Sequence, residues 1–304
     1  MTQAFRGIVG TPTTAFTPDN RVDLATFEKQ VDWLIRMGVE AVAHPMNIGE
    51  APNLSLDERR DLIQRLVRAA GGRVPVLIHV SMAGTDQVKD LALYSQKAGA
   101  AGVVVMPPYH WQPARAAMMN HFRAIGGALD IAFFAYNNPK AVQVEIAPDM
   151  VAELIETVPN FAGLKDASYH MRYFTEVCTI ASAMRPGFGV FVGTEYLLPA
   201  MALGGAGAFS ACGEVAPRLL LDLYEACAKG EMERARALQH KVGKLLKVLM
   251  VNYPASIKYA MELMGRPVGK TRLPILPLTD EAKAKVRKDL ENLGVLDGEP
   301  RDWA

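Results

Sequence analysis

The sequence has almost no net charge, few cysteines and no long uninterrupted hydrophobic segment. Each of these features excludes a class of protein. Its 304 residues include 33 basic and 32 acidic side chains, so the net charge is only +1. That balance argues against a broad nucleic-acid-binding surface. Half of the residues are hydrophobic, which excludes disorder as the dominant state.

Three cysteines, Cys178, Cys212 and Cys227, are too few for a disulfide scaffold and form no CxxC pair. We expect three thiols in a reducing compartment. The most apolar stretches, 100–106 and 197–212, are too short or too interrupted by glycine to span a bilayer. The first ten residues lack the apolar segment of a signal peptide. We therefore expect a cytoplasmic protein that has neither a membrane nor a nucleic acid as its partner.

Short apolar segments alternate with longer amphipathic segments up to about residue 215. The short segments are nearly all apolar, as in parallel strands that are covered on both faces. The predicted strands are Gly7–Phe16, Ala41–His44, Val74–Val80, Gly102–Met106, Ile131–Tyr136, Phe161–Lys165, Gly189–Val192 and Gly207–Ser210. The predicted helices are Leu24–Met37, Leu56–Ala70, Thr85–Ala98, Arg115–Gly126, Ala147–Val158, Tyr169–Ala183 and Glu195–Leu203. This alternation predicts the α/β class and a (β/α)8 TIM barrel. A doubly wound sheet is the alternative, but no GxGxxG motif follows the first strand.

Beyond Val215 the strand pattern stops and helical patterns follow. The predicted helices are Pro217–Lys229, Met232–Val251, Ser256–Met264 and Asp280–Leu293. The segment 266–278 contains three prolines and is predicted to be extended. We therefore predict two parts, a barrel over residues 1–228 and a C-terminal helical extension over residues 229–304.

In such barrels the reacting groups lie where strands end and in the loops that follow. Lys165 ends an apolar strand, where poor hydration would lower the pKa of its amine and free it to attack a carbonyl. Pairing with Asp166, or extension to solvent, is the alternative. Tyr136 ends the preceding strand and could transfer protons at the same centre, or it could be a core aromatic. The two residues alone leave both interpretations open.

Several short motifs follow one another in a fixed order along the chain. They are Gly10-Thr-Pro-Thr-Thr-Ala-Phe16, Ile48-Gly-Glu50, Leu54-Ser-Leu-Asp-Glu-Arg59, Pro107-Pro-Tyr109, Tyr136-Asn-Asn-Pro139, Gly163-Leu-Lys-Asp166, Gly204-Gly-Ala-Gly207 and Lys258. With these motifs, and over essentially its whole length, the chain resembles the dihydrodipicolinate synthase / N-acetylneuraminate lyase family of Schiff-base-forming class I aldolases. The tyrosine strand followed by the Gly-x-Lys strand is the most specific part of the resemblance.

The resemblance implies a (β/α)8 barrel with appended helices and a lyase for 2-oxo acids such as pyruvate or a 2-oxo-3-deoxy sugar acid. Lys165 then forms the imine, and Tyr136 transfers protons. Gly49 and Glu50 match a Gly-Glu pair whose carboxylate we interpret as structural, because it would hold its loop by hydrogen bonds. No cofactor and no metal are implied, since the imine on Lys165 is itself the electron sink. Most members are homotetramers built as dimers of dimers.

The loop before Glu50 departs from the family pattern, which has two adjacent hydroxyl residues there. Ile48 has no hydroxyl, so the usual tyrosine–threonine–tyrosine proton relay cannot form in that way. Backbone N–H groups of Asn47 and Ile48 can still hold a carboxylate. The relay's third member, from a neighbouring subunit, aligns with His110, which titrates near neutrality and could act as acid or base. Alternatively, Tyr109 fills that role by a shift of one residue.

A second departure concerns the substrate. Dihydrodipicolinate synthases carry an arginine at the position of Ala141, and here a lysine, Lys140, precedes it, which offers a point charge rather than a bidentate fork. The third strand, with His79, resembles the lyase branch. An aldolase or dehydratase is therefore favoured over a synthase that condenses pyruvate with an aldehyde. His79, Lys140 and Phe209 join Asn47, Ile48 and Tyr109 as the expected substrate-binding residues.

Two other classes of function are weaker candidates. His44, His79 and His110 lie near the ends of successive strands, but neither an HxH nor an HExxH motif occurs, so a metal-dependent hydrolase is disfavoured. A non-catalytic sensor for a 2-oxo acid would explain Ile48, but such a sensor needs neither Lys165 nor Tyr136.

Overall fold

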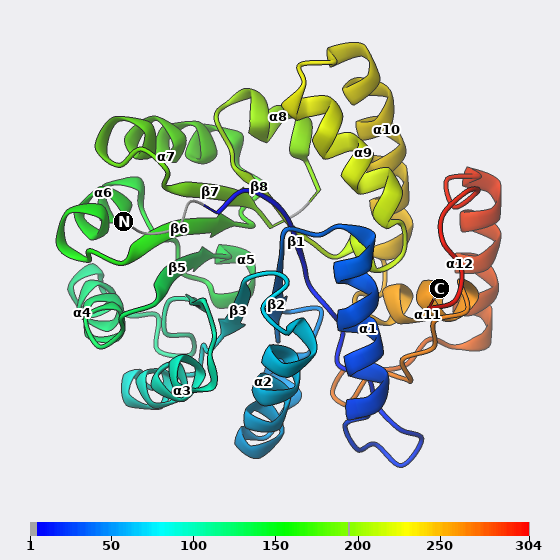
Figure 1. The fold of residues 1–304 in the computed structure, drawn as a ribbon, viewed down its shortest axis with the longest axis horizontal. Helices are drawn as coiled ribbons and strands as arrows, with labels where there is room; N and C mark the ends of the chain where they lie inside the picture. Colours follow the sequence, from blue (N-terminus) through cyan, green and yellow to red (C-terminus); the bar gives the residue numbers. More distant parts are fainter. Residues whose placement is uncertain (1–4, 194, 304) are drawn as a thin grey trace.

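Eight parallel strands close into a barrel in the computed structural model, which describes residues 5–193 and 195–303 (Figure 1). The strands are β1 (Gly7–Gly10), β2 (Ala41–His44), β3 (Val76–His79), β4 (Gly102–Val105), β5 (Ala132–Asn137), β6 (Phe161–Asp166), β7 (Gly189–Val192) and β8 (Gly207–Ser210). Each strand pairs with the next in chain order, and β8 pairs with β1. Every strand residue is buried, which explains why the strands are apolar rather than alternating. The predicted (β/α)8 barrel is confirmed.

Helices surround the barrel. They are α1 (Leu24–Met37), α2 (Leu56–Ala70), α3 (Thr85–Ala98), α4 (Arg115–Gly126), α5 (Pro139–Val142), α6 (Pro148–Thr157), α7 (Met171–Met184), α8 (Leu197–Ala202) and α9 (Pro217–Ala228). Short 3-10 turns cover Ala51–Asn53 and Cys212–Glu214. Local chemistry sets the helix ends. The side chain of Ser55 accepts a hydrogen bond from the Glu58 amide, Glu58 accepts one from the Ser55 amide, and Gly71 ends α2 in the left-handed conformation.

The first strand is shorter than predicted, because β1 ends at Gly10 and not at Phe16. In the segment that follows, threonine hydroxyls replace strand pairing. Thr11 donates to the Ser210 carbonyl, Thr13 to the Gln30 amide oxygen and Thr14 to the Gly49 carbonyl. The apolar and β-branched composition of this buried loop is what made it look like a strand.

Two helices begin two residues later than predicted. Helix α7 begins at Met171 instead of Tyr169, which has a left-handed φ of 64° that no helix residue adopts. Helix α8 begins at Leu197 instead of Glu195, whose carboxylate is used to hold the turn after β8. Helix α5 was not predicted; the Asn138 side chain caps it and Pro139 begins it.

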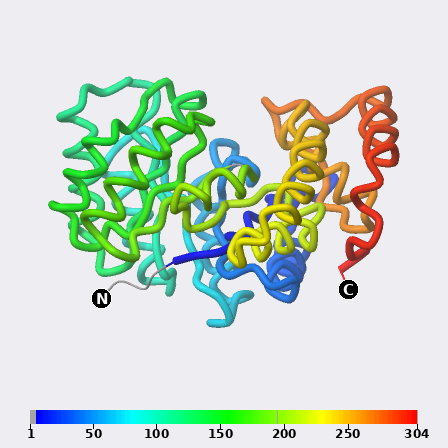
Figure 2. The backbone as a smooth tube through the Cα atoms, turned by 90° about the horizontal axis from the view of Figure 1, so that it is seen from above, coloured from blue at the N-terminus to red at the C-terminus, as the bar shows by residue number. Residues whose placement is uncertain are grey.

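The C-terminal extension consists of α10 (Met232–Leu249), α11 (Ala255–Leu263) and α12 (Asp280–Leu293). Figure 2 shows these helices, yellow to red, gathered on one side of the molecule beside the barrel. Helix α10 packs along α9 and also contacts α8 and α12. The predicted boundary between residues 228 and 229 falls in the turn from α9 to α10 and stays a prediction.

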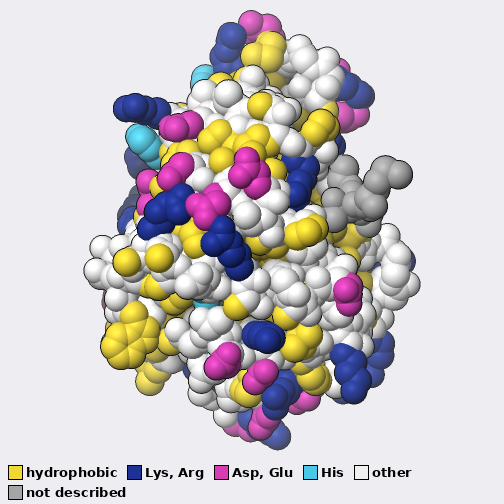
Figure 3. Space-filling view, turned by 90° about the vertical axis from the view of Figure 1, so that its left-hand side faces the viewer, with side chains coloured by type: hydrophobic (Ala, Val, Ile, Leu, Met, Phe, Trp, Pro, Cys, Tyr) yellow, Lys and Arg dark blue, Asp and Glu magenta, His cyan; other side chains and the backbone are white. Residues whose placement is uncertain are grey.

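The face over α4, α6 and α7 mixes charges of both signs (Figure 3). Arg115 pairs there with Asp149 and Glu153, and Arg123 pairs with the same glutamate. Within residues 5–193 and 195–303, the helices are all too short or too polar to cross a membrane.

Candidate active site

Lys165 lies in β6, inside the barrel and near the C-terminal ends of the strands. Its side chain is only 4% exposed. Its Nζ lies 3.9 Å from the centre of the Tyr136 ring and 5.3 Å from that of Phe209. Burial disfavours the ammonium form and lowers the pKa of Lys165 to about 7, although the carboxylate of Glu195 acts in the opposite direction. A substantial fraction of the amine is therefore uncharged at neutral pH and able to act as a nucleophile.

Tyr136 lies beside Lys165 because β5 and β6 pair with these two residues in register. Its side chain is 2% exposed, and its hydroxyl accepts a hydrogen bond of 3.1 Å from the Asn138 amide. Burial raises the pKa of the Tyr136 hydroxyl, and the nearby Tyr169 and Asp166 add to that effect. The phenol therefore stays protonated at neutral pH and is a proton donor next to the amine.

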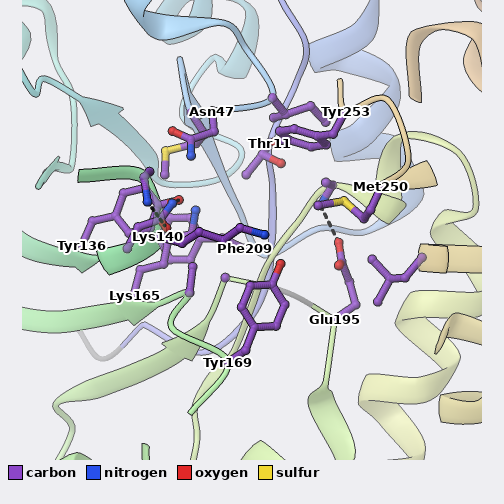
Figure 4. A pocket seen from close by; sticks show the side chains of 18 residues that line it. Thr11, Asn47, Tyr136, Lys140, Lys165, Tyr169, Glu195, Phe209, Met250 and Tyr253 are labelled. Carbon is purple, nitrogen blue, oxygen red and sulfur yellow. Dashed lines mark hydrogen bonds between the residues drawn. The ribbon is translucent and has the colours of Figure 1, made fainter. Parts of the chain in front are cut away.

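Both side chains line a cavity of about 350 Å³ at this end of the barrel. Figure 4 shows Tyr136, Lys140 and Lys165 on one side of the cavity, and Glu195 and Met250 on the other. The expected residues Asn47, Ile48, Lys140 and Phe209 are all on its wall, together with Ala141. The structure thus brings together six of the predicted site residues.

Asn47 and Ile48, in the loop after β2, line this cavity. The N–H groups of these two residues donate to no acceptor within the described parts of the chain, whereas the following amides of Gly49 and Glu50 bond to Met46 and Asn47. Two adjacent free N–H groups are suited to bind a carboxylate. The loop begins with a cis peptide bond between His44 and Pro45.

Glu50 is the last residue of this loop; it is fully buried and is not part of the cavity wall. One carboxylate oxygen is 2.6 Å from the Nζ of Lys258, and the other accepts a hydrogen bond of 2.8 Å from the Arg272 amide. Glu50 has a left-handed φ of 56°. Both carboxylate oxygens of Glu50 thus contact the C-terminal extension, and the structural role of the Gly49-Glu50 pair stays a prediction.

Three of the expected catalytic and substrate-binding residues lie outside the cavity wall of their own chain. His79 is buried next to Tyr136, with ring centres 5.9 Å apart, and its Nδ1 is 2.7 Å from the Pro45 carbonyl oxygen. Tyr109 is half-buried, and burial raises the pKa of its hydroxyl. His110 is exposed, has a φ of 83° and contacts the ring of Trp111. Neither Tyr109 nor His110 is among the residues that line the cavity of this chain.

On the part of the cavity wall that the barrel provides, the sequence did not assign four polar residues, namely Thr11, Asn138, Tyr169 and Glu195. Asn138 and Glu195 belong to segments that follow strands, so strand position could have indicated them. Burial raises the pKa of the Glu195 carboxyl, although it accepts hydrogen bonds from the Ser210 hydroxyl and from the amides of residues 211 and 212.

Part of the wall comes from outside the barrel. Leu246 in α10, Met250 after it, and Tyr253 line the cavity. Nothing in the local pattern of α10 distinguishes these residues from an ordinary helix packing face, and only its docking against the barrel places them at the site.

The buried histidines are not arranged as metal ligands. In the described ranges 5–193 and 195–303, no group of three or more His, Cys, Asp or Glu side chains is suited to hold a metal ion. Burial, together with the positive charge of Arg59, lowers the pKa values of His44 and His79 to about 3, so both rings are neutral. His44 lies 3.0 Å from the Thr14 hydroxyl.

A buried lysine amine beside a tyrosine, at the C-terminal end of a (β/α)8 barrel, defines a class of lyases that act through an imine. The sequence model of the dihydrodipicolinate synthetase family matches residues 4–293. The chain belongs to this family, as its motifs predicted.

The named relatives include both synthases and an aldolase. The chain is 34% identical to a 4-hydroxy-tetrahydrodipicolinate synthase of Bradyrhizobium diazoefficiens over 96% of this chain and 98% of the relative. It is 31% identical to the probable 2-dehydro-3-deoxy-D-pentonate aldolase YjhH of Escherichia coli, over 96% of this chain and 98% of the relative. The structure of YagE from Escherichia coli, a prophage protein of the dihydrodipicolinic acid synthase family in complex with pyruvate, matches with a TM-score of 0.93 at 28% identity, covering 96% and 100% of the two chains. The chain is thus an enzyme of the Schiff-base lyase class, which acts on a 2-oxo acid.

Proposed function

We propose that Lys165 forms the imine with the 2-oxo acid and that Tyr136 transfers the protons. The observation that carries this proposal is the buried amine with a pKa of about 7, located 3.9 Å from the Tyr136 ring centre. A sensor that only binds a 2-oxo acid would need neither an uncharged amine nor a protonated phenol beside it.

The substrate carboxylate rests on the free N–H groups of Asn47 and Ile48. This binding needs no side-chain hydroxyl, so the isoleucine does not prevent it. The missing hydroxyl removes one link of the usual proton relay. Tyr136 therefore exchanges protons with the substrate itself, and its hydroxyl is held by Asn138.

The steps follow from these positions. The Nζ of Lys165 adds to C2, and the carbonyl oxygen leaves as water with one proton from the amine and one from Tyr136. The protonated imine then accepts the electrons of the C3–C4 bond as that bond breaks. The C4 hydroxyl gives its proton to the phenolate of Tyr136 and leaves as an aldehyde. The same proton then goes to C3, and water hydrolyses the imine. In a dehydratase, loss of a C3 proton and of the C4 hydroxyl replaces the cleavage.

We propose a substrate of the lyase branch, such as a 2-oxo-3-deoxy sugar acid that yields pyruvate. Ala141 on the cavity wall offers no charge to an aldehyde's carboxylate, and Lys140 beside it is exposed at the rim. The likeness to the pentonate aldolase supports this choice. The synthase reaction, condensation of pyruvate with an aldehyde, is the second candidate, supported by the likeness to named synthases.

The assembly and setting of the enzyme are part of the same proposal. We propose a homotetramer, a dimer of dimers, in which His110 or Tyr109 reaches a neighbouring site. The 73% exposed ring of Trp111 beside them supports an interface there. We propose that the enzyme works without cofactor or metal, because the imine supplies the electron sink. Three unpaired cysteines support a cytoplasmic setting.

Borohydride trapping tests the function directly. The protein is reduced in the presence of pyruvate, 2-oxo-3-deoxy sugar acids, 4-hydroxy-2-oxoglutarate and arylidene pyruvates, and peptides are analysed by mass spectrometry. We expect an adduct on Lys165 whose mass gives the retained fragment. Folded protein that forms no adduct with any of these acids would instead be a sensor.

A further inference from the structure

The loop over residues 45–50, called here the carboxylate loop, is held from several sides. The barrel provides two of its anchors. The Thr14 hydroxyl donates to the Gly49 carbonyl at 2.6 Å, and the ring of His79 lies 2.7 Å from the Pro45 carbonyl oxygen. These contacts fix the two ends of the loop backbone around Asn47 and Ile48.

The third anchor comes from the C-terminal extension. Glu50 of the loop is 0% exposed and Lys258 of α11 is 3% exposed, and their charged groups are 2.6 Å apart. The second oxygen of Glu50 accepts a hydrogen bond from the backbone amide of Arg272, which is 222 positions away along the chain. The extension therefore contacts the loop through one side chain and one backbone group.

Lys258 is itself fixed in place. Its ammonium group also donates to the Lys270 carbonyl at 3.2 Å and lies 4.4 Å from the centre of the Phe16 ring. The guanidinium of Arg272 lies 4.4 Å from the same ring and binds both carboxylate oxygens of Glu58. The contacts of both cations with the Phe16 ring, and the paired hydrogen bonds between Arg272 and the Glu58 carboxylate, restrict this part of the extension to one geometry.

A buried ion pair is weak evidence for a stabilising role, because desolvation of both charges offsets their attraction. Removing one partner is costly, since the other charge stays buried and unpaired, whereas removing both charges is often nearly neutral. Stability and positioning can therefore be separated by experiment at this pair.

We propose that Lys258 is a positioning residue of the reaction: by holding Glu50, it keeps the N–H groups of Asn47 and Ile48 directed at the substrate carboxylate. The C-terminal extension thereby sets the affinity of the barrel site for its 2-oxo acid. This inference rests on the proposed function of the loop as the carboxylate site. It assigns the extension a second task besides supplying Met250 and Tyr253 to the cavity wall.

The test uses the full-length protein and pyruvate. The variants are Lys258→Met, the double variant Glu50→Gln/Lys258→Met, and Lys285→Met as a matched control. Lys285 belongs to the same extension and pairs with Asp289, but its side chain is 70% exposed. Two quantities are measured for each variant, the pyruvate concentration that gives half-maximal borohydride adduct on Lys165, and the midpoint of thermal unfolding.

We expect Lys258→Met to raise the half-saturating pyruvate concentration about tenfold or more, because a displacement of about 1 Å is costly at a reacting site. The maximal adduct should stay unchanged, as for a loss of uniform binding. The double variant should recover most of the thermal stability but keep the weaker pyruvate binding. The control should match the wild type in both quantities.

The outcomes separate the two proposals. If the wild type forms no adduct, the proposed function fails and this inference fails with it. If the wild type forms the adduct but Lys258→Met has the same half-saturation, only the positioning role is overturned. Recovery of both stability and pyruvate binding in the double variant would also overturn it, because Lys258 would then only balance a buried charge. Should Lys258→Met not fold, the double variant decides.

Discussion

At the scale of single residues, Lys165 shows how a strand end creates a nucleophile. The same lysine on a helix surface would be fully hydrated and protonated. Here burial lowers the pKa of its amine to about 7, and the partial opposition by Glu195 keeps it from falling further. The chemistry therefore depends on where the barrel places an ordinary side chain.

This pKa predicts the pH dependence of imine formation. Below pH 7 the amine is mostly protonated, so the rate should fall about tenfold for each pH unit, and above pH 7 it should level off. The rate of pyruvate trapping by cyanoborohydride between pH 5.5 and 9 measures this. A rate that keeps rising toward pH 10 would show a hydrated lysine and contradict the buried-amine assignment.

Replacement of the two site residues should separate binding from proton transfer. Lys165→Ala should abolish both the adduct and turnover while the protein stays folded. Tyr136→Phe should still form the adduct but turn over about a hundredfold more slowly or worse, the usual scale for a positioned proton donor. Tyr94→Phe is the matched control, because its hydroxyl accepts a hydrogen bond from Gln64 on the outer helices, away from the cavity. Full turnover in Lys165→Ala would falsify the imine mechanism.

At the scale of elements, the register between β5 and β6 determines which residues lie next to each other in the site. Residue pairs Tyr136–Lys165 and Phe134–Gly163 face each other across this ladder. A Cβ on Gly163 would lie 2.5 Å from both the Gly189 carbonyl oxygen and the Phe134 ring. The glycine of the Gly-x-Lys motif therefore lets three strands approach one another beneath the lysine.

Gly163→Ala should accordingly destabilise the barrel. Overpacking of this kind costs about 1–3 kcal/mol, and it should lower the thermal midpoint by several degrees. Gly243→Ala in α10 is the control, because nothing lies within 4 Å of a Cβ there and alanine favours a helix. Unfolding followed by circular dichroism measures both. Equal midpoints for the two variants would show that the strands adjust to the extra methyl group.

The elements were largely predictable from the sequence, and the exceptions have identifiable local causes. Buried parallel strands and amphipathic helices leave periodic patterns, so bounds such as Leu24–Met37 and Gly207–Ser210 agree with the structure. The errors at residues 11–16 and 195 occur where side chains bond to distant backbone groups, whereas the error at Tyr169 occurs at a left-handed backbone conformation. Such contacts leave no periodic signal in the sequence.

At the scale of the whole molecule, the site is assembled from parts that the sequence keeps far apart. That Lys165, Tyr136 and the carboxylate loop lie at one face could be predicted, because strand ends of a barrel meet there, whereas their roles were implied by the resemblance to the family. Tyr253 and Lys258 could not be given roles, because their contribution depends on how the extension docks onto the barrel. The same limit applies to contacts between subunits.

The exposed position of His110 leads to a prediction about the contacts between subunits. In its own chain it lies outside the cavity wall, so a catalytic His110 must act in a neighbour's site. Mixing inactive Lys165→Ala with impaired His110→Ala should then restore activity. After subunit exchange, a hybrid dimer has one site that takes Lys165 from one chain and His110 from the other, so about a quarter of all sites become complete.

The measurement is turnover after the two variants are co-unfolded and refolded together, compared with each variant refolded alone. The corresponding mixture of Lys165→Ala with Tyr109→Phe tests the other candidate in the same way. Restoration in only one mixture identifies the residue that crosses the interface. Restoration in neither, with hybrid tetramers present by mass, would mean that neither side chain takes part, and that Tyr136 exchanges its protons without help from a second subunit.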